Sequence, residues 1–140
     1  MGSYHLSPVT RIKRAIRRLI SRISSRYSSP VANFFWDGPE IPLWSKACIH
    51  SFKNNGFKVI VYSYSDKLKD EFSGTGITVA DAEEICEKSF RDKLFNAAKP
   101  DTYGKTYACF TDFFRLRLLS QRPGTWWFDT DIFCINNAKK

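Results

Sequence analysis

Asp129 and Asp131 are the residues of this sequence whose types and spacing point most directly to chemistry. They lie in the stretch PGTWWFDTDIF, Pro123 to Phe133, where two tryptophans and a phenylalanine precede the first carboxylate. The aromatic run is typical of a buried strand, and an unpaired carboxylate at a buried position is energetically costly. We therefore expect a positively charged group to bind at this pair.

The spacing of the pair fits a divalent metal ion. Carboxylates at i and i+2 on a strand point to the same side, with their backbones roughly 7 Å apart. Oxygen ligands with open coordination positions suit Mg²⁺ or Mn²⁺ shared with substrate phosphates. An Asp-x-Asp pair also occurs in surface turns, so this alternative stays open.

Two common carboxylate motifs fit the neighbouring residues poorly. An EF-hand loop needs a third oxygen ligand and then a glycine, whereas Ile132, Phe133 and Cys134 follow here. A haloacid-dehalogenase phosphatase has further acidic and lysine groups well downstream, and only the nine residues 132–140 remain. Both classes are disfavoured.

The elements that must position the pair alternate between strand and helix patterns. Short β-branched or aromatic runs predict strands, and i, i+3, i+4 apolar spacing predicts helices. The predicted strands are VANFFW, FKVIVYSY and TWWFD, and the predicted helices are IPLWSKACIHSFKNN, DAEEICEKS and YACFTDFFRLRLLSQ. This order predicts an α/β fold, a mostly parallel sheet with crossover helices, in which ligands collect at the carboxyl ends of the strands.

The formal net charge of +8 is concentrated at the N-terminus. Residues 1–36 hold seven of the 22 Lys and Arg residues and no Asp or Glu, which leaves fifteen basic and fourteen acidic residues in 37–140. The body therefore carries a net charge of only +1, which disfavours a nucleic-acid-binding surface over the whole domain. We divide the chain into residues 1–30, a basic segment with a Ser-rich linker, and a globular part, residues 31–140.

The basic segment VTRIKRAIRRLISRISSRY predicts an amphipathic helix, with an apolar stripe and arginines over the rest of its surface. Such a helix can bind an anionic membrane surface. A mitochondrial-type presequence and a helix packed on its own domain remain open as alternatives.

The four cysteines do not form a metal-binding motif. Cys48, Cys86, Cys109 and Cys134 are too far apart for a CxxC site, and each lies in an apolar run. We expect buried free thiols, as in a reducing compartment. Because no segment approaches 18 apolar residues and a secretory signal is absent, we expect a cytoplasmic protein, either soluble or peripheral at a membrane.

Two stretches together resemble sugar-nucleotide glycosyltransferases of the glycosyltransferase 32 type, which are related to the glucosylating domain of large clostridial toxins. FTDFFRLRLLSQRPGTWWFDTDIF is similar to the family's Ser/Thr-Asp-x-x-Arg helix, its glycine turn and its aromatic strand ending in Asp-x-Asp. NFFWDGPEIPLWSKACIHSFKNNGFKVIVYSY is similar to the family's first strand and helix. The resemblance covers residues 32–136 and departs from the family at Pro123-Gly124, where Gly-Gly is usual.

The resemblance implies a GT-A-like fold and a site for a nucleotide-sugar donor, UDP-linked in our interpretation. It implies that Phe35 and Trp36 hold the nucleotide base, that Asp112 and Arg115 contact the donor's sugar and ribose, and that Trp127 lines the same cleft. The residues alone are equally consistent with a core position for Trp36. They also allow Asp112 and Arg115 to form an ion pair on the helix surface. We expect Trp126 and Phe128 in the core.

With Mg²⁺ or Mn²⁺ at Asp129 and Asp131, the resemblance implies retaining transfer of a sugar to a glycan or lipid-linked acceptor. Only IFCINNAKK, which we expect to form one short strand and a polar tail, follows the pair. Since a GT-A domain has the pair near its middle, we expect only the N-terminal, donor-binding half of the domain, inactive in transfer by itself. The alternative functions are a membrane-surface binding module and an inactive glycosyltransferase-like protein.

Overall fold

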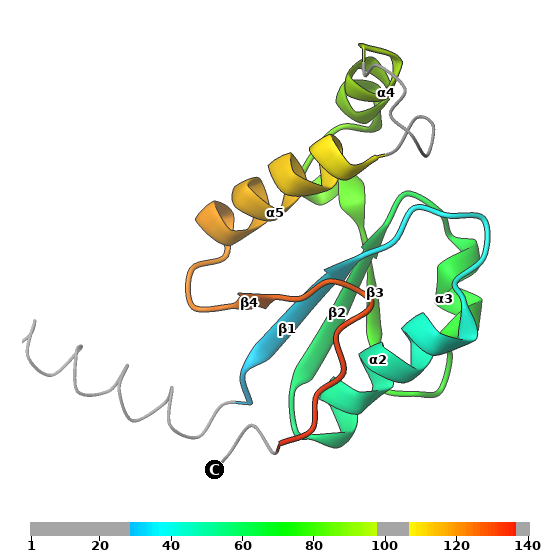
Figure 1. Cartoon of the computed structure of the whole chain (residues 1–140), viewed down its shortest axis with the longest axis vertical. Coiled ribbons are helices and arrows are strands. Elements are labelled where there is room, and N and C mark those ends of the chain that lie inside the picture. Colours follow the sequence, from blue (N-terminus) through cyan, green and yellow to red (C-terminus); the bar gives the residue numbers. More distant parts are fainter. Residues whose placement is uncertain (1–28, 98–106, 137–140) are drawn as a thin grey trace, which may run out of the picture.

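The structure, a computed structural model, describes residues 29–97 and 107–136 (Figure 1). The basic amphipathic helix expected in the N-terminal segment lies outside these residues. The described part builds a single sheet with helices on both of its faces.

The sheet contains four strands, all parallel, in the order β3-β2-β1-β4. This arrangement confirms the predicted α/β fold with crossover connections. In chain order, β2 pairs with one side of β1 and β3 pairs with the outer side of β2, whereas β4 pairs with the other side of β1. The direction in which successive strands join the sheet therefore reverses between β1 and β4. The strands are β1 Val31–Phe35, β2 Lys58–Ser63, β3 Thr78–Asp81 and β4 Trp126–Trp127.

The α-helices are α2 Leu43–Asn54, α3 Lys67–Glu71, α4 Lys88–Ala97 and α5 Ala108–Gln121. The predicted helices around α2 and α5 are confirmed, and α2 ends before Gly56, whose φ of 89° ends the helix. The single helix predicted over DAEEICEKS is wrong. The end of β3 and a 3₁₀ turn η1, Ala82–Glu84, occupy its first half, and α4 begins only at Lys88.

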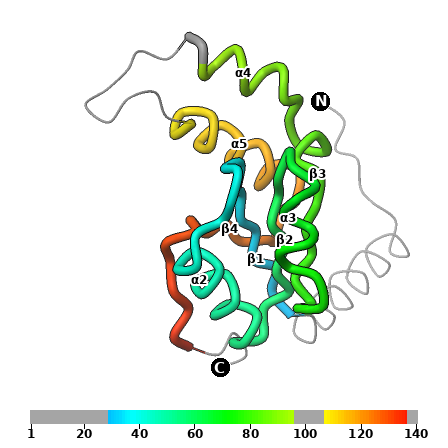
Figure 2. Tube along the Cα trace, turned by 90° about the vertical axis from the view of Figure 1, so that its right-hand side faces the viewer, coloured from blue at the N-terminus to red at the C-terminus, as the bar shows by residue number. Residues whose placement is uncertain are grey.

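Two hydrophobic clusters pack on opposite faces of the sheet, because neighbouring strand residues point to opposite sides. Phe34 and Val61 belong to the cluster beneath α2 and α3, while the next residues along each strand, Phe35 and Tyr62, belong to the cluster beneath α5. Figure 2 shows α4 at one end of the molecule, beside α5 and beyond the ends of the strands. The core therefore fixes α2 and α5 firmly against the two faces of the sheet.

The strand β4 is shorter and more exposed than expected. It is an edge strand of two residues, and Trp126 is 58% exposed, so the expectation of a core tryptophan there is wrong. Phe128 does pack against the cluster beneath α2, at a ring-centroid distance of 4.3 Å from Phe52. Among the described residues no strand lies on the outer side of β4, and Trp126 is exposed at this edge.

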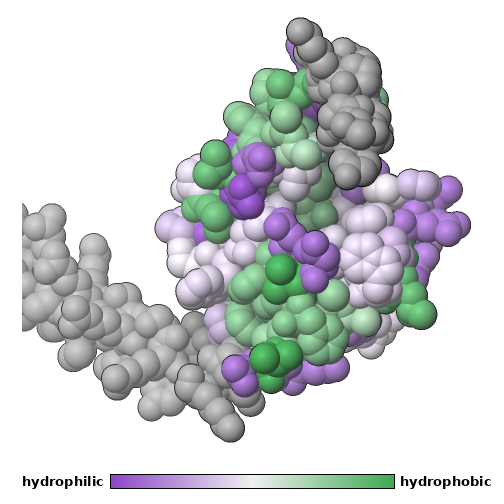
Figure 3. Space-filling view, in the orientation of Figure 1, coloured by the Kyte–Doolittle hydropathy of each residue, from purple (hydrophilic) through white to green (hydrophobic). Residues whose placement is uncertain are grey.

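The residues after the aspartate pair do not form the expected strand. Residues 132–136 instead run along α2, where Asn55 Nδ2 donates to the Cys134 carbonyl at 2.9 Å and Cys134 N donates to Ser51 Oγ at 2.8 Å. Ile132, Phe133 and Ile135 remain exposed, and Figure 3 shows apolar side chains gathered on this face. Residues 132–136 are therefore hydrogen-bonded to α2 through their backbone, while several of their apolar side chains are exposed to solvent.

The cysteines are free thiols, as expected, but not all of them are buried. Cys48 and Cys86 are buried, Cys134 is half-buried, and Cys109 is exposed on α5, which corrects the expectation for that residue. Within residues 29–97 and 107–136, no helix has the length and apolar character needed to cross a bilayer.

Candidate functional site

A cavity of about 520 Å³ lies at the carboxyl ends of β1 and β4. Its walls come from residues 35–39 after β1, residues 127–130 after β4, and Tyr107 with Thr111 at the start of α5. The cavity therefore opens where the strand order reverses, which is the usual ligand position in open α/β sheets. Its volume is within the range of about 300–1,000 Å³ that is common for small-molecule sites.

The register of the two strands brings these walls together. Ala32 pairs with Trp126 and Asn33 with Trp127, and Phe128 N donates to the Asn33 carbonyl at 3.1 Å. Continued by two residues, this register sets Asp129 level with Phe35. Segments far apart in the sequence thus meet at one end of the sheet.

Trp36 is the largest side chain on the β1 wall. Its indole is half-buried and packs against Gly38, where an added Cβ would lie 2.9 Å from the Trp36 ring. Its Nε1 is buried without a hydrogen-bond partner in the described residues. The absence of a side chain at residue 38 therefore allows the loop after β1 to fold over the indole.

Trp127 and Asp129 form the opposite wall. Trp127 Nε1 donates to Asp129 Oδ1 at 3.0 Å, and the Trp127 ring lies 6.2 Å from that of Phe114 on α5. Packing against α5 thus fixes the indole, and the indole in turn orients the Asp129 carboxylate. The second carboxylate oxygen makes no hydrogen bond within the described residues.

The aspartate pair lies in a turn and not on the strand. β4 ends at Trp127, and Ile132 N donates to the Asp129 carbonyl at 3.2 Å, which closes a turn with Thr130 and Asp131 at its centre. Both aspartates are exposed, and Asp129 lines the cavity whereas Asp131 does not. The expectation that the pair ends a buried strand is therefore wrong, although both residues lie at the cavity end of the sheet.

Two predicted donor-binding residues are not among those that line the cavity. Arg115 Nη2 donates to Asp112 Oδ1 at 2.7 Å, and this pair lies on α5 with 38% and 65% of the two side chains exposed. Thr111, immediately before Asp112, does line the cavity. In the described structure Asp112 and Arg115 form the surface ion pair that the sequence left open.

Asp37 was missed by the sequence analysis and is the most buried carboxylate of the cavity wall. Its side chain is 9% exposed and forms a salt bridge with Arg91 of α4. Burial raises the pKa of Asp37, and the nearby Arg91 charge opposes part of that rise. Its position directly after the first strand was the available signal, because ligands collect there.

Arg91 itself carried no signal in the sequence, because Asp37 lies 54 residues away along the chain. Burial acts to lower the pKa of Arg91, but the hydrogen bond to Asp92 and the charge of Asp37 outweigh it and raise that pKa. The guanidinium therefore stays charged behind the cavity.

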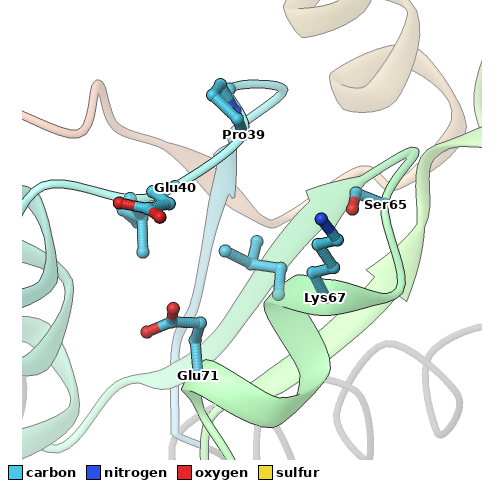
Figure 4. A pocket seen from close by; sticks show the side chains of 8 residues that line it. Pro39, Glu40, Ser65, Lys67 and Glu71 are labelled. Carbon is cyan, nitrogen blue, oxygen red and sulfur yellow. The ribbon is translucent and has the colours of Figure 1, made fainter.

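A second, smaller cavity of about 150 Å³ lies on the other side of the loop after β1 (Figure 4). Gly38 and Pro39 line both cavities. The lining of the smaller one includes Glu40 from the loop after β1, Ser65 from the loop after β2, and Lys67 and Glu71 from the short helix α3, where Glu71 pairs with Lys46. Since charges of both signs line it, it lacks the electrostatic bias that would select an anion or a cation.

We compared the chain with protein-family models, curated proteins and solved structures, and nothing matched. Function therefore has to be inferred from the geometry of the larger cavity and from the resemblance in the sequence.

Proposed function

We propose that the larger cavity binds a nucleotide-sugar donor, UDP-linked, together with Mg²⁺ or Mn²⁺, and that the chain is the donor-binding part of a glycosyltransferase-like protein. The observation that carries this proposal is that Phe35, Trp36, Trp127 and Asp129, four residues chosen from the sequence, all line one cavity. That cavity lies at the reversal of strand order, where nucleotides bind in doubly wound folds.

The aromatic walls suit a nucleobase. A base held against Trp36 or Trp127 would gain about 1–3 kcal/mol from stacking. Thr111 and Tyr107 lie at the start of α5, where they could contact the ribose or the sugar. Phe35 and Phe128, which pack on the two hydrophobic clusters, make the inner end of the cavity apolar.

The aspartates fit the demands of Mg²⁺ or Mn²⁺ shared with a diphosphate. Mg²⁺ in such sites commonly uses one or two carboxylates and takes its other ligands from phosphates and water. No group of three His, Cys, Asp or Glu side chains comes together in the described parts of the chain, so the phosphates would complete the site. Asp129, oriented by the Trp127 indole, would hold the ion, with Asp131 from the same turn.

When bound, the ion supplies charge neutralisation at the departing diphosphate. The chain's own residues orient the donor: the aromatic walls fix the base, and the turn at Asp129 fixes the distance from the base to the diphosphate. In this account the acceptor, a glycan or lipid-linked sugar, would approach from the open side of the cavity.

Calorimetry with UDP tests this proposal. We expect UDP to bind more tightly with Mn²⁺ than with EDTA, and Asp129→Asn to remove the difference. Asp66→Asn is the matched control, since Asp66 pairs with Lys69 on the surface and does not line the cavity. Equal binding in Mn²⁺ and EDTA by the unaltered chain would refute the proposal.

A second candidate function, binding to an anionic membrane surface, is favoured by the basic sequence of residues 1–28 and by the exposed Trp126. The basic segment 1–28 joins the described structure at the start of β1, where Ala32 pairs with the exposed Trp126. Tryptophan prefers the interface between membrane and water. An enzyme that acts on lipid-linked sugars would use both functions.

A further inference from the structure

Arg91 is a buried arginine on α4 whose side chain lies behind the cavity. The residue is 9% exposed, and its Nη1 donates to Asp37 Oδ2. Its Nε and Nη2 donate to Asp92 Oδ1 at 2.9 and 2.6 Å. The other ion pairs among the described residues, those without Arg91, leave at least 28% of each side chain exposed. A buried charge of this kind is costly unless its partners are well placed.

The partners of Arg91 that lie outside α4 come from three different segments. Asp37 follows β1, Tyr64 follows β2, and Tyr107 precedes α5. The Arg91 Cζ lies over both aromatic rings, 5.1 Å from the Tyr64 centroid and 5.3 Å from that of Tyr107. One guanidinium therefore connects two strand ends and a helix start.

Two of these partners, Asp37 and Tyr107, line the cavity on different walls. The Tyr107 ring also stacks on Phe95, one turn after Arg91 on α4, with the ring centroids 4.3 Å apart. Tyr64 is fixed in turn, because its hydroxyl donates to the Cys86 carbonyl at 2.6 Å. Asp92 is 51% exposed, whereas Tyr64 and Tyr107 are each held by a further contact of their own.

We propose that Arg91 is a positioning residue that sets the separation between the Asp37 and Tyr107 walls of the cavity. This inference rests on the proposed nucleotide site for its functional consequence. Lysine could not replace it, because a compact ammonium lacks the planar group that covers both rings and the several donors that reach Asp37 and Asp92. Loss of this group would widen the cavity without removing any residue that touches the ligand.

The first arm of the test needs no nucleotide. Hydrogen exchange followed by mass spectrometry on the full chain should show faster exchange at residues 37–39 and 107–111 in Arg91→Met and Arg91→Lys. Exchange in β1 and β2 should be unchanged. Arg122→Met is the matched control, since it removes an exposed pair with Glu84 outside the cavity. Asp37→Asn should give the same local pattern as Arg91→Met.

The second arm measures UDP affinity with Mn²⁺ by calorimetry. We expect Arg91→Lys to weaken binding by about tenfold or more, because small misplacements of site groups have large effects. We expect Arg122→Met to bind as the unaltered chain does. If Arg91→Met does not fold, Arg91→Lys decides both arms.

The outcomes separate this inference from the proposed function. Failure of the unaltered chain to bind UDP would refute the nucleotide site, and the exchange pattern would still decide whether Arg91 fixes the two walls. Unchanged or uniformly raised exchange in the Arg91 variants would overturn the inference. So would UDP binding of unchanged affinity in Arg91→Lys.

Discussion

Asn33 Nδ2 donates a hydrogen bond of 2.9 Å to the carbonyl of Trp126, which lies 93 residues later in the chain. Asn33 is 1% exposed in the middle of β1, and Trp126 begins the two-residue edge strand β4. Because β4 makes so few ladder bonds, this side-chain bond contributes strongly to its attachment. It thereby holds the two walls of the cavity in register.

Replacing Asn33 with alanine should detach β4 from β1. We expect a loss of about 1–3 kcal/mol in the free energy of unfolding, because the Trp126 carbonyl loses its partner and a buried side chain is removed. Urea denaturation measures this loss. Asn54→Ala, at an exposed position on α2, should change stability by less than about 0.5 kcal/mol. Equal effects of the two substitutions would show that the bond does not secure β4.

The sequence predicted the elements with strong periodicity and missed those fixed by distant contacts. The strands and helices around Phe34, Phe52 and Phe114 were predicted because their apolar spacing reflects local burial. The strand β3 was missed because its four residues are only partly buried and carry no clear alternation. The exposure of Trp126 could not be predicted, because it depends on the position of β4 at the sheet edge.

The candidate site was predicted where it depends on strand ends and missed where it depends on tertiary contacts. Phe35, Trp36 and Trp127 were selected through the family resemblance and Asp129 through its spacing from Asp131, and all four end or follow strands whose carboxyl ends meet at one edge of the sheet. Asp37 and Arg91 lie 54 residues apart, and no sequence motif relates the two positions, so their pairing could not be predicted. The direction of α5 side chains, which leaves Asp112 outside the cavity wall, depends on how the helix rotates on its core residues.

The role of the aromatic wall can be separated from general stability. Trp36→Ala should weaken UDP binding by about 1–3 kcal/mol, the value of one base stacked on an aromatic ring. Trp44→Ala is the control, because Trp44 is 56% exposed on α2 and does not line the cavity. Calorimetry at saturating Mn²⁺ gives both affinities. Similar affinities for the two variants would exclude stacking on Trp36.

The burial of Asp37 gives a pH dependence with a definite sign. Its pKa is raised above 3.8, so between that value and the raised one the folded chain retains a proton that the unfolded chain has lost. The contribution of Asp37 to stability should therefore fall as pH rises through this window and level off above it. The measurement is the unfolding free energy of the unaltered chain minus that of Asp37→Asn, followed against pH. A difference that increases with pH would mean that the Arg91 charge outweighs burial.

Thiol reactivity should follow the exposure of the cysteines. Cys109 is exposed on α5 and should be alkylated first by iodoacetamide, whereas Cys48 and Cys86 are buried. Burial also raises the pKa of Cys86, which lowers its thiolate fraction at neutral pH. Mass spectrometry after brief labelling of the native chain identifies the modified residues. Early labelling of Cys86 would contradict the packing of η1 against the sheet.

The basic N-terminal segment predicts binding to anionic vesicles. Each Lys or Arg near the surface contributes about 1 kcal/mol, less than additively, and salt should weaken the binding. Co-sedimentation with phosphatidylserine vesicles should require residues 1–29, with phosphatidylcholine vesicles as the control. Binding that persists after their deletion would assign the membrane contact to another surface.

The central claim, that a metal and a nucleotide bind at the carboxyl ends of β1 and β4, is tested most directly by paramagnetic broadening in ¹H–¹⁵N NMR spectra. Mn²⁺ added with UDP should broaden the amide signals of residues 36–38 and 127–132 first, with Mg²⁺ as the diamagnetic control. Signals from α3 and from β3 should persist. Broadening centred on the exposed acids Asp81, Glu83 and Glu84, or spread uniformly over the chain, would contradict the claim.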